Sequence, residues 1–138
     1  AALVIADRAT AEALGMPVIA EILAYGQTAG PGTGLQAQPA NALRIALEKA
    51  GLDVDDLDLV EINEAFAAVA LYSANLLGMP HERVNVHGGA IALGHPLGAS
   101  GARIVVTLIS ALKARGGGIG GAALCGGGGQ GDALIVKV

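Results

Sequence analysis

A glycine-rich stretch from Asn85 to Gly101, NVHGGAIALGHPLGASG, constrains the fold of this chain more than any other feature. It holds five glycines, two histidines and one proline in seventeen residues, and the apolar run RIVVTLISAL follows closely. Glycine costs backbone entropy and packs no side chain, so these residues indicate tight turns or a close approach of the backbone. His95 lies between Gly94 and Pro96, and the proline pushes the backbone of its neighbour out of the α region. We therefore treat His95 as a candidate for chemistry, with an incidental histidine in a turn as the alternative.

The composition predicts one domain with an aliphatic core. The 138 residues are 53% hydrophobic and only 2% aromatic, and this length is typical of a single domain. A net charge of −4 with eight Lys and Arg residues excludes a basic nucleic-acid surface. The apolar run from Ile104 to Leu112 is shorter than the ~20 residues of a membrane span. The apolar excess therefore indicates faces that meet other protein.

The single cysteine, Cys125, excludes a disulfide within the chain and fits a reducing compartment. We accordingly expect a cytoplasmic location. The chain shows no signal peptide and opens without Met inside the apolar run AALVIA. We interpret it as a piece of a longer protein.

Strand-like and helix-like segments alternate along the chain. We expect strands over residues 2–6, 18–25, 57–62, 118–125 and 132–138, and helices over residues 10–15, 38–50, 65–77 and 98–114. This βαβαβαββ order predicts an α/β fold with a mostly parallel five-stranded sheet, covered by helices on both faces and closed by an antiparallel pair. The helix over 98–114 is apolar nearly all round, so we expect it to be buried on every side.

Two further polar residues lie where predicted strands end, the place where open α/β sheets carry their sites. Asn63 follows one strand and Cys125 ends another. Each has a simpler interpretation, because Asn63 could cap a helix and a lone cysteine is most often a small buried hydrophobe. The glycines at 126–129 could form a flexible turn or a phosphate cradle. A Walker loop needs Gly-Lys-Ser/Thr after its glycines, and residues 130–132 are Gln-Gly-Asp.

The acidic run over residues 53–58 does not predict a metal site. A calcium loop needs glycine at its sixth position, and Asp58 stands there. A solvated turn is the better interpretation, and we expect no metal elsewhere in the chain. His81 is expected to be a surface histidine.

Three blocks together closely resemble the C-terminal domain of thiolases: Asn63-Glu64-Ala65-Phe66, GHPLGASG around His95, and CGGGGQG around Cys125. Their order and their separations of 32 and 30 residues match as well. The resemblance covers essentially the whole chain, so residues 1–138 are expected to form one thiolase C-terminal domain. It implies acyl transfer between coenzyme A thioesters. The reaction is a reversible Claisen condensation of two acetyl-CoA to acetoacetyl-CoA and coenzyme A, or thiolytic cleavage of a 3-ketoacyl-CoA, with no cofactor beyond these substrates.

The resemblance also implies a role for each site residue. His95 polarises a nucleophilic cysteine and helps to bind the enolate oxygen, while Asn63 holds a water that completes this oxyanion hole. Cys125 acts as the acid and base at the substrate Cα and the leaving thiol. The N–H of Gly127 contributes to a second oxyanion hole, where a donor must come within ~3 Å of the developing charge.

Ala65 and Phe66 match positions that line the acyl pocket of thiolases. The nucleophilic cysteine of that family lies in its N-terminal half, whereas Cys125 stands in the acid/base setting. The resemblance therefore implies an N-terminal thiolase domain as partner, a homodimer or homotetramer of the full-length enzyme, and no complete activity for this chain alone. His87 stands where many family members have Asn, and we expect it to be structural.

Two alternatives remain at this point. A condensing enzyme of the ketoacyl synthase type would use two histidines, or His and Asn, without a second cysteine, so Cys125-Gly126-Gly127 speaks against it. A thiolase-like scaffold or partner domain without catalysis would not need Asn63, His95 and Cys125 together.

Overall fold

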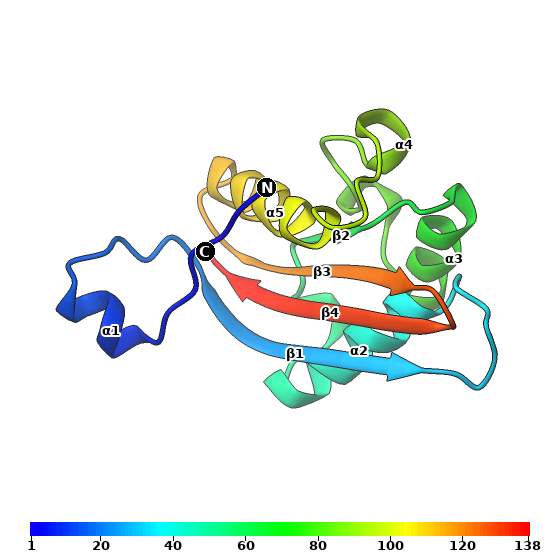
Figure 1. The fold of residues 1–138 in the computed structure, drawn as a ribbon, viewed down its shortest axis with the longest axis horizontal. Helices are drawn as coiled ribbons and strands as arrows, with labels where there is room; N and C mark the ends of the chain where they lie inside the picture. The colour runs from blue at the N-terminus through cyan, green and yellow to red at the C-terminus, as the bar shows by residue number, and fades with distance from the viewer.

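A four-stranded sheet with helices on both faces forms the centre of the molecule (Figure 1). The computed structural model describes residues 1–138. The strands are β1 (Glu21–Ala29), β2 (Leu59–Ile62), β3 (Ile119–Gly126) and β4 (Gln130–Lys137). The helices are α1 (Arg8–Ala13), α2 (Gln38–Ala50), α3 (Ala67–Leu77), α4 (Ala90–Leu93) and α5 (Ser100–Ala114), with 3₁₀ turns η1 (Val54–Asp56) and η2 (His81–Arg83).

The sheet is mixed, with the strand order β1-β4-β3-β2. Strands β2 and β3 pair in parallel, with Ile62 opposite Ala123, whereas β4 pairs antiparallel with both β1 and β3. The α/β class, the helices on both faces and the closing antiparallel pair are confirmed. The prediction of a mostly parallel five-stranded sheet is wrong, because β4 inserts between two strands that run the same way. The carboxyl ends of β1, β2 and β3 therefore lie at the same end of the sheet as the β3–β4 turn. We call this end the carboxyl edge of the sheet.

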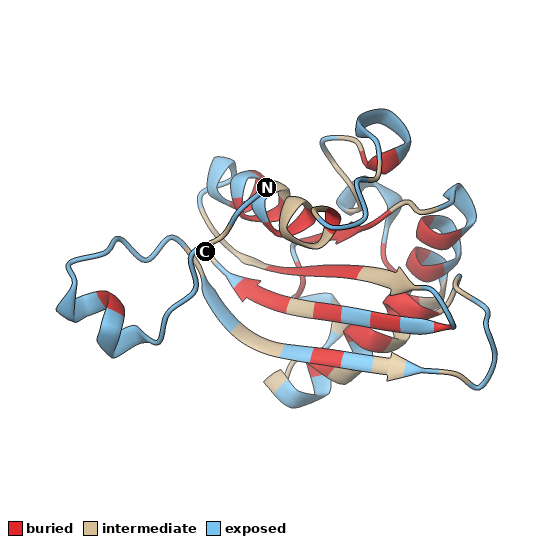
Figure 2. Ribbon diagram, viewed as in Figure 1, coloured by how far each residue is buried: buried red, intermediate tan, exposed pale blue.

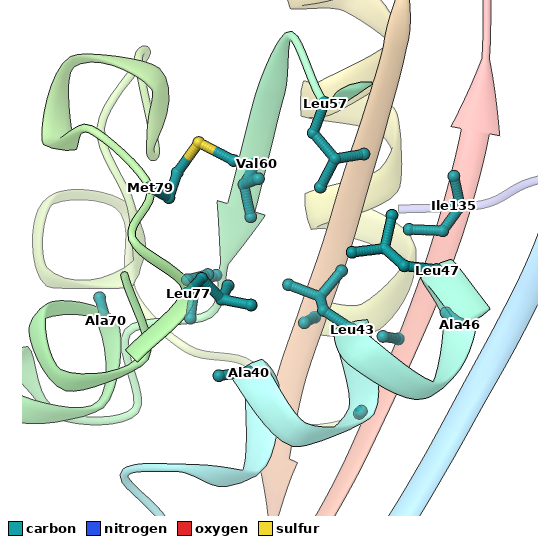
Figure 3. Packing of buried hydrophobic residues seen from close by; sticks show 14 of the residues in the cluster. Ala40, Leu43, Ala46, Leu47, Leu57, Val60, Ala70, Leu77, Met79 and Ile135 are labelled. Atoms are coloured by element: carbon teal, nitrogen blue, oxygen red, sulfur yellow. The ribbon is translucent and has the colours of Figure 1, made fainter. Parts of the chain in front are cut away.

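Helix α2 covers one face of the sheet and has the predicted bounds. Pro39 lies in its first turn, and Gly51 ends it with a left-handed φ of 67°. Leu43, Leu57 and Ile135 are among the largest fully buried side chains on this face. Figure 3 shows Leu43 and Leu47 of α2 packed toward the strands, with Leu77 and Met79 closing the far side of the cluster.

Helix α5 covers the opposite face. Its residues Ile104, Leu108 and Leu112 are buried against β2, β3 and β4. The prediction that this helix is buried on every side is wrong for this chain, since Val106 is 39% exposed and Ser110 is also exposed. Only one side of α5 meets the sheet, and the exposed positions of the helix lie away from this buried side (Figure 2). No helix of the chain is both long enough and apolar enough to cross a membrane.

The segment that contains α1 extends away from the sheet (Figure 2), whereas Leu3 and Ala20 pack against the buried cluster under α5. The strand predicted over 2–6 is absent, and Val4 and Ile5 are 82% and 70% exposed. The predicted short helix exists as α1, but its N-cap is Asp7, whose carboxylate accepts hydrogen bonds from the N–H and the hydroxyl of Thr10 at 2.9 and 2.7 Å. The apolar composition of residues 2–6 therefore predicted a strand that does not form, because this segment has no strand of the chain to pair with.

Candidate active site

Asn63 and His95, which lie 32 residues apart in the sequence, are in contact at the end of the parallel pair. Asn63 directly follows β2, is fully buried, and donates its main-chain N–H to the carbonyl of Ala123 on β3 at 2.9 Å. Its amide nitrogen Nδ2 lies 3.3 Å from Nε2 and 3.4 Å from Nδ1 of His95. The structure thus brings two of the predicted site residues together at the carboxyl edge of the sheet.

The segment between Gly94 and Ser100 holds His95 at the start of α5. Gly94 has a φ of 92°, a conformation that favours glycine. The carbonyl of Pro96 accepts the main-chain N–H groups of Ala99 and Ser100 at 2.8 and 3.0 Å, which begins the helix. The half-buried His95 ring then places Nδ1 2.6 Å from the hydroxyl oxygen of the buried Ser100.

Glu64 and Asn85 tie the glycine-rich stretch to β2. The side chain of Asn85 bonds both main-chain groups of Ile62, accepting its N–H at 2.8 Å and donating to its carbonyl at 2.9 Å. The carboxylate of Glu64 accepts the N–H of Ile91 at 3.0 Å. A Cβ at Gly89 would overlap the Glu64 carboxylate, so a larger residue there would displace this carboxylate from Ile91. The expected close approach of the glycine-rich backbone is thereby confirmed.

Cys125 lies at the same sheet edge but outside the Asn63–His95 contact. It pairs with Gly131 of β4, two residues beyond the Ala123 that pairs with Ile62. It is half-buried and packs against the core on the α2 face. Burial raises the pKa of its thiol, with a small opposing effect from a main-chain hydrogen bond. Burial at this position thus favours the protonated thiol over the thiolate.

The glycines after Cys125 make a tight turn that is fastened to the loop before α2. Gly129 has a φ of 82°, and a Cβ on it would overlap the carbonyl oxygen of Gly32. Its own carbonyl accepts hydrogen bonds from Nε2 of the buried Gln38 at 2.7 Å and from the N–H of Gly30 at 3.0 Å. Gly127 is exposed, has open space around its Cα, and donates its N–H to no carbonyl of the chain.

The two predicted pocket residues follow Asn63 at this edge. The N–H of Ala65 donates to the Asn63 carbonyl at 3.0 Å, and Phe66, the residue that precedes α3, is 65% exposed. His87 is exposed, and His81 is exposed as expected. The structure contains no cluster of three or more His, Cys, Asp or Glu side chains with the geometry to hold a metal ion.

A buried charge pair next to this edge escaped the sequence analysis. Glu61 of β2 is only 1% exposed, and its Oε2 lies 3.4 Å from Nη1 of Arg103 on α5. Burial raises the pKa of Glu61 to about 7, against the attraction of Arg103 and with some repulsion from Glu64. A carboxyl group within the otherwise apolar strand sequence LVEI was the available signal. Ser100, a hydroxyl five residues after His95, was also missed.

Two polar atoms remain buried without a hydrogen-bond partner in the chain, Oδ1 of Asn63 and Nη2 of Arg103. Buried polar atoms are nearly always paired. The free Oδ1 therefore marks the Asn63 amide as a group with hydrogen-bonding capacity left for a further molecule at the site.

The sequence matches a known protein family and several curated proteins. Residues 16–138 match the family model described as "Thiolase, C-terminal domain". The chain is 57% identical over 137 residues to a "Probable acetyl-CoA acetyltransferase" of Mycobacterium tuberculosis, covering 99% of this chain and 35% of that protein. It is 50% identical to an "Acetyl-CoA acetyltransferase" of Escherichia coli, with the same coverage, and 48% identical to "Acetyl-CoA acetyltransferase 1" of Arabidopsis thaliana, covering 99% and 33%. The chain spans about a third of the length of these curated relatives.

Proposed function

Because this chain belongs to the thiolase family as its C-terminal domain, we propose that the full-length protein transfers acyl groups between coenzyme A thioesters. The reaction is the condensation of two acetyl-CoA to acetoacetyl-CoA and coenzyme A, or the thiolytic cleavage of a 3-ketoacyl-CoA. The observation that carries the proposal is the contact between the buried Asn63 and the half-buried His95 at the sheet edge that Cys125 shares. The acetyl-CoA acetyltransferase names of the relatives support the same substrate class.

The chemistry needs a stabilised enolate. Removal of a proton from the carbon next to a thioester puts negative charge on the thioester oxygen, and preorganised donors lower the cost of that charge. We assign Nε2 of His95 as one donor and a water held by Asn63 as the other. The unpartnered Oδ1 of Asn63 supports this assignment, because a water can donate one hydrogen to that oxygen and the other to the enolate.

Cys125 is assigned as the acid and base. It protonates the departing coenzyme A thiolate during acylation, and the Cys125 thiolate that results takes the Cα proton during condensation. The N–H of Gly127 is assigned to a second oxyanion hole around the acyl-enzyme, and its lack of a carbonyl partner supports that role. Ala65 and Phe66, next to Asn63 in the chain, are assigned to the acyl pocket.

The nucleophilic cysteine is proposed to come from an N-terminal thiolase domain, in line with relatives that are about three times as long as this chain. We further propose that the full-length enzyme is a homodimer or homotetramer, works in fatty acid metabolism including β-oxidation, and is cytoplasmic. Coenzyme A thioesters are its substrates, and no additional cofactor is part of the mechanism.

The decisive experiment replaces Cys125 by Ala in the full-length enzyme. The acyl-enzyme forms on the other cysteine, so acetyl-CoA should still acetylate the protein, as detected by mass spectrometry. Exchange of the acetyl-CoA methyl protons with deuterated water, followed by proton NMR, should fall ~10²–10⁴-fold, the usual contribution of a general base. Exchange at the wild-type rate would show that Cys125 is not the base. A wild-type enzyme that is never acetylated would favour a scaffold role instead.

A further inference from the structure

We propose that Ser100 is a positioning residue that fixes the tautomer of His95. In this arrangement Nδ1 carries the hydrogen, and Nε2 keeps a lone pair that can accept a proton. The proposal rests on the proposed function for its catalytic meaning, but the position of the hydrogen can be measured independently of any activity.

The hydroxyl of Ser100 contacts two groups at once. Its oxygen lies 2.6 Å from Nδ1 of His95 and 3.1 Å from the carbonyl oxygen of Pro96, one helical turn earlier. Ser100 is fully buried, so no bulk water competes for these bonds. The same Pro96 carbonyl also accepts main-chain N–H groups, a sharing that is common at helix ends.

A hydroxyl has a single hydrogen, and the two contacts differ in what they require. The Pro96 carbonyl can only accept, so the 3.1 Å contact is a hydrogen bond only when the Ser100 O–H donates to it. The Nδ1 contact is then a hydrogen bond only if Nδ1–H donates to the hydroxyl oxygen. With a bare Nδ1 the hydroxyl would turn its hydrogen to the ring and leave two oxygen lone pairs facing each other. The continuous chain Nδ1–H to Oγ–H to carbonyl satisfies both contacts.

No other neighbour selects between the two ring nitrogens. The amide nitrogen of Asn63 is almost equally far from Nδ1 and Nε2, at 3.4 and 3.3 Å, so it packs along the ring without distinguishing them. Ser100 contacts Nδ1 alone. The tautomer is therefore decided by this one hydroxyl.

The fixed tautomer has a direct consequence for proton transfer. A neutral His95 with hydrogen on Nδ1 can take the proton of the nucleophilic thiol at Nε2, which gives a thiolate and an imidazolium. The Nδ1–H bond to Ser100 persists through this step and becomes charge-assisted, so the imidazolium is stabilised. The new Nε2–H can then donate to an oxyanion. His95 returns this proton to the nucleophilic thiolate when the acyl group leaves it. The opposite tautomer would present a hydrogen to the thiol and could not accept its proton.

Neutron diffraction from crystals of the full-length wild-type enzyme tests the proposal directly. We expect one hydrogen or deuterium bonded to His95 Nδ1 and directed at Ser100 Oγ. We expect a second one bonded to Oγ and directed at the Pro96 carbonyl. A Ser100 hydroxyl hydrogen that points at an unprotonated Nδ1, in a neutral ring protonated at Nε2, would overturn the proposal. This measurement needs no variant to fold.

Kinetics of variants test the consequence. Ser100→Ala should slow acetylation of the full-length enzyme about 10- to 100-fold, with an unchanged KM for acetyl-CoA, in line with the loss found when the partner that orients a metal-bound histidine is removed. Ser100→Thr keeps a hydroxyl and should restore most of the rate. The matched control is Thr107→Val on the same helix. It removes a hydroxyl that donates to the carbonyl of Arg103, four residues earlier, at 3.0 Å, and it lies twelve residues after His95 in the sequence. The acetylation rate of this variant should stay at the wild-type level.

Several outcomes contradict the proposal. Acetylation of Ser100→Ala at the wild-type rate would overturn it, as would a Thr variant that melts like the wild type yet is as slow as the Ala variant. A wild-type enzyme with hydrogen on Nδ1 but no acetylation would instead refute the proposed function while leaving the tautomer assignment intact.

Discussion

Glu61 shows how a single buried residue makes the stability of this fold depend on pH. Its carboxyl group is almost inaccessible, and burial raises its pKa from 4.5 to about 7 despite the neighbouring Arg103. Between these values the folded chain holds a proton that the unfolded chain has released. The free energy of unfolding must therefore decrease as the pH rises through this window, with the full stabilisation present only below the unfolded pKa.

We expect this decrease to be at most ~3 kcal/mol between about pH 4.5 and pH 7. Chemical denaturation of the full-length wild-type protein and of Glu61→Gln, at the two ends of this range, measures it. The Gln variant should lack this part of the pH dependence, because an amide does not titrate. Glu82→Gln is the matched control, since Glu82 is exposed in η2. Identical pH dependence of wild type and Glu61→Gln would contradict the prediction.

At the residue scale, the sequence revealed those site residues that carry their own signal. His95 stood out between glycine and proline, and Asn63 stood out at a strand end, but their contact depends on how the glycine-rich stretch folds back over β2. Ser100 and Glu61 escaped notice because serine and glutamate are common, and each gains its meaning only from a partner. The partner of Glu61 is Arg103, 42 residues away in the sequence.

At the element scale, Gly26 decides how closely β1 can approach α2. It is buried in the middle of the strand, and a Cβ there would overlap the carbonyl oxygen of Ala42 and lie 2.7 Å from the main-chain nitrogen of Ala46. Because both are backbone atoms of α2, no side chain can move aside. Gly26→Ala should force the strand and helix apart and lower the free energy of unfolding by ~1–3 kcal/mol or more.

Urea denaturation of the full-length protein measures this loss. Gly32→Ala is the matched control, since Gly32 lies in the loop after β1 with open space around it and no left-handed φ. It should change the free energy of unfolding by less than about 0.5 kcal/mol. Equal stability of the two variants would show that the packing of β1 against α2 tolerates a methyl group.

The helices were predicted more accurately than the sheet, because helix signals are local in the sequence and strand pairing is not. Helix α2 was recognised because its proline, its apolar face and the glycine that ends it all lie within or directly next to its thirteen residues. The position of β1 depends on its pairing with β4, more than one hundred residues later, and no local pattern reports that pairing. The apolar run over 2–6 shows the converse error, since it satisfies a local strand pattern but finds no strand to pair with in this chain.

At the scale of the whole molecule, the apolar surface of this chain leads to the last prediction. Fifteen large hydrophobic side chains are exposed, among them Val4 at 82%, Leu97 at 83% and Phe66 at 65%. Monomeric soluble proteins rarely expose contiguous apolar patches of large area, so residues 1–138 expressed alone should self-associate in light scattering and bind a hydrophobic dye. They should also fail to cleave acetoacetyl-CoA with coenzyme A, since Cys125 is their only thiol and is assigned as the acid and base. The full-length protein is the control, and it should neither bind the dye strongly nor lack turnover. A dye-free monomer of residues 1–138 would contradict the proposed N-terminal domain partner, and cleavage above the buffer rate would show that the nucleophile is not supplied from outside this chain.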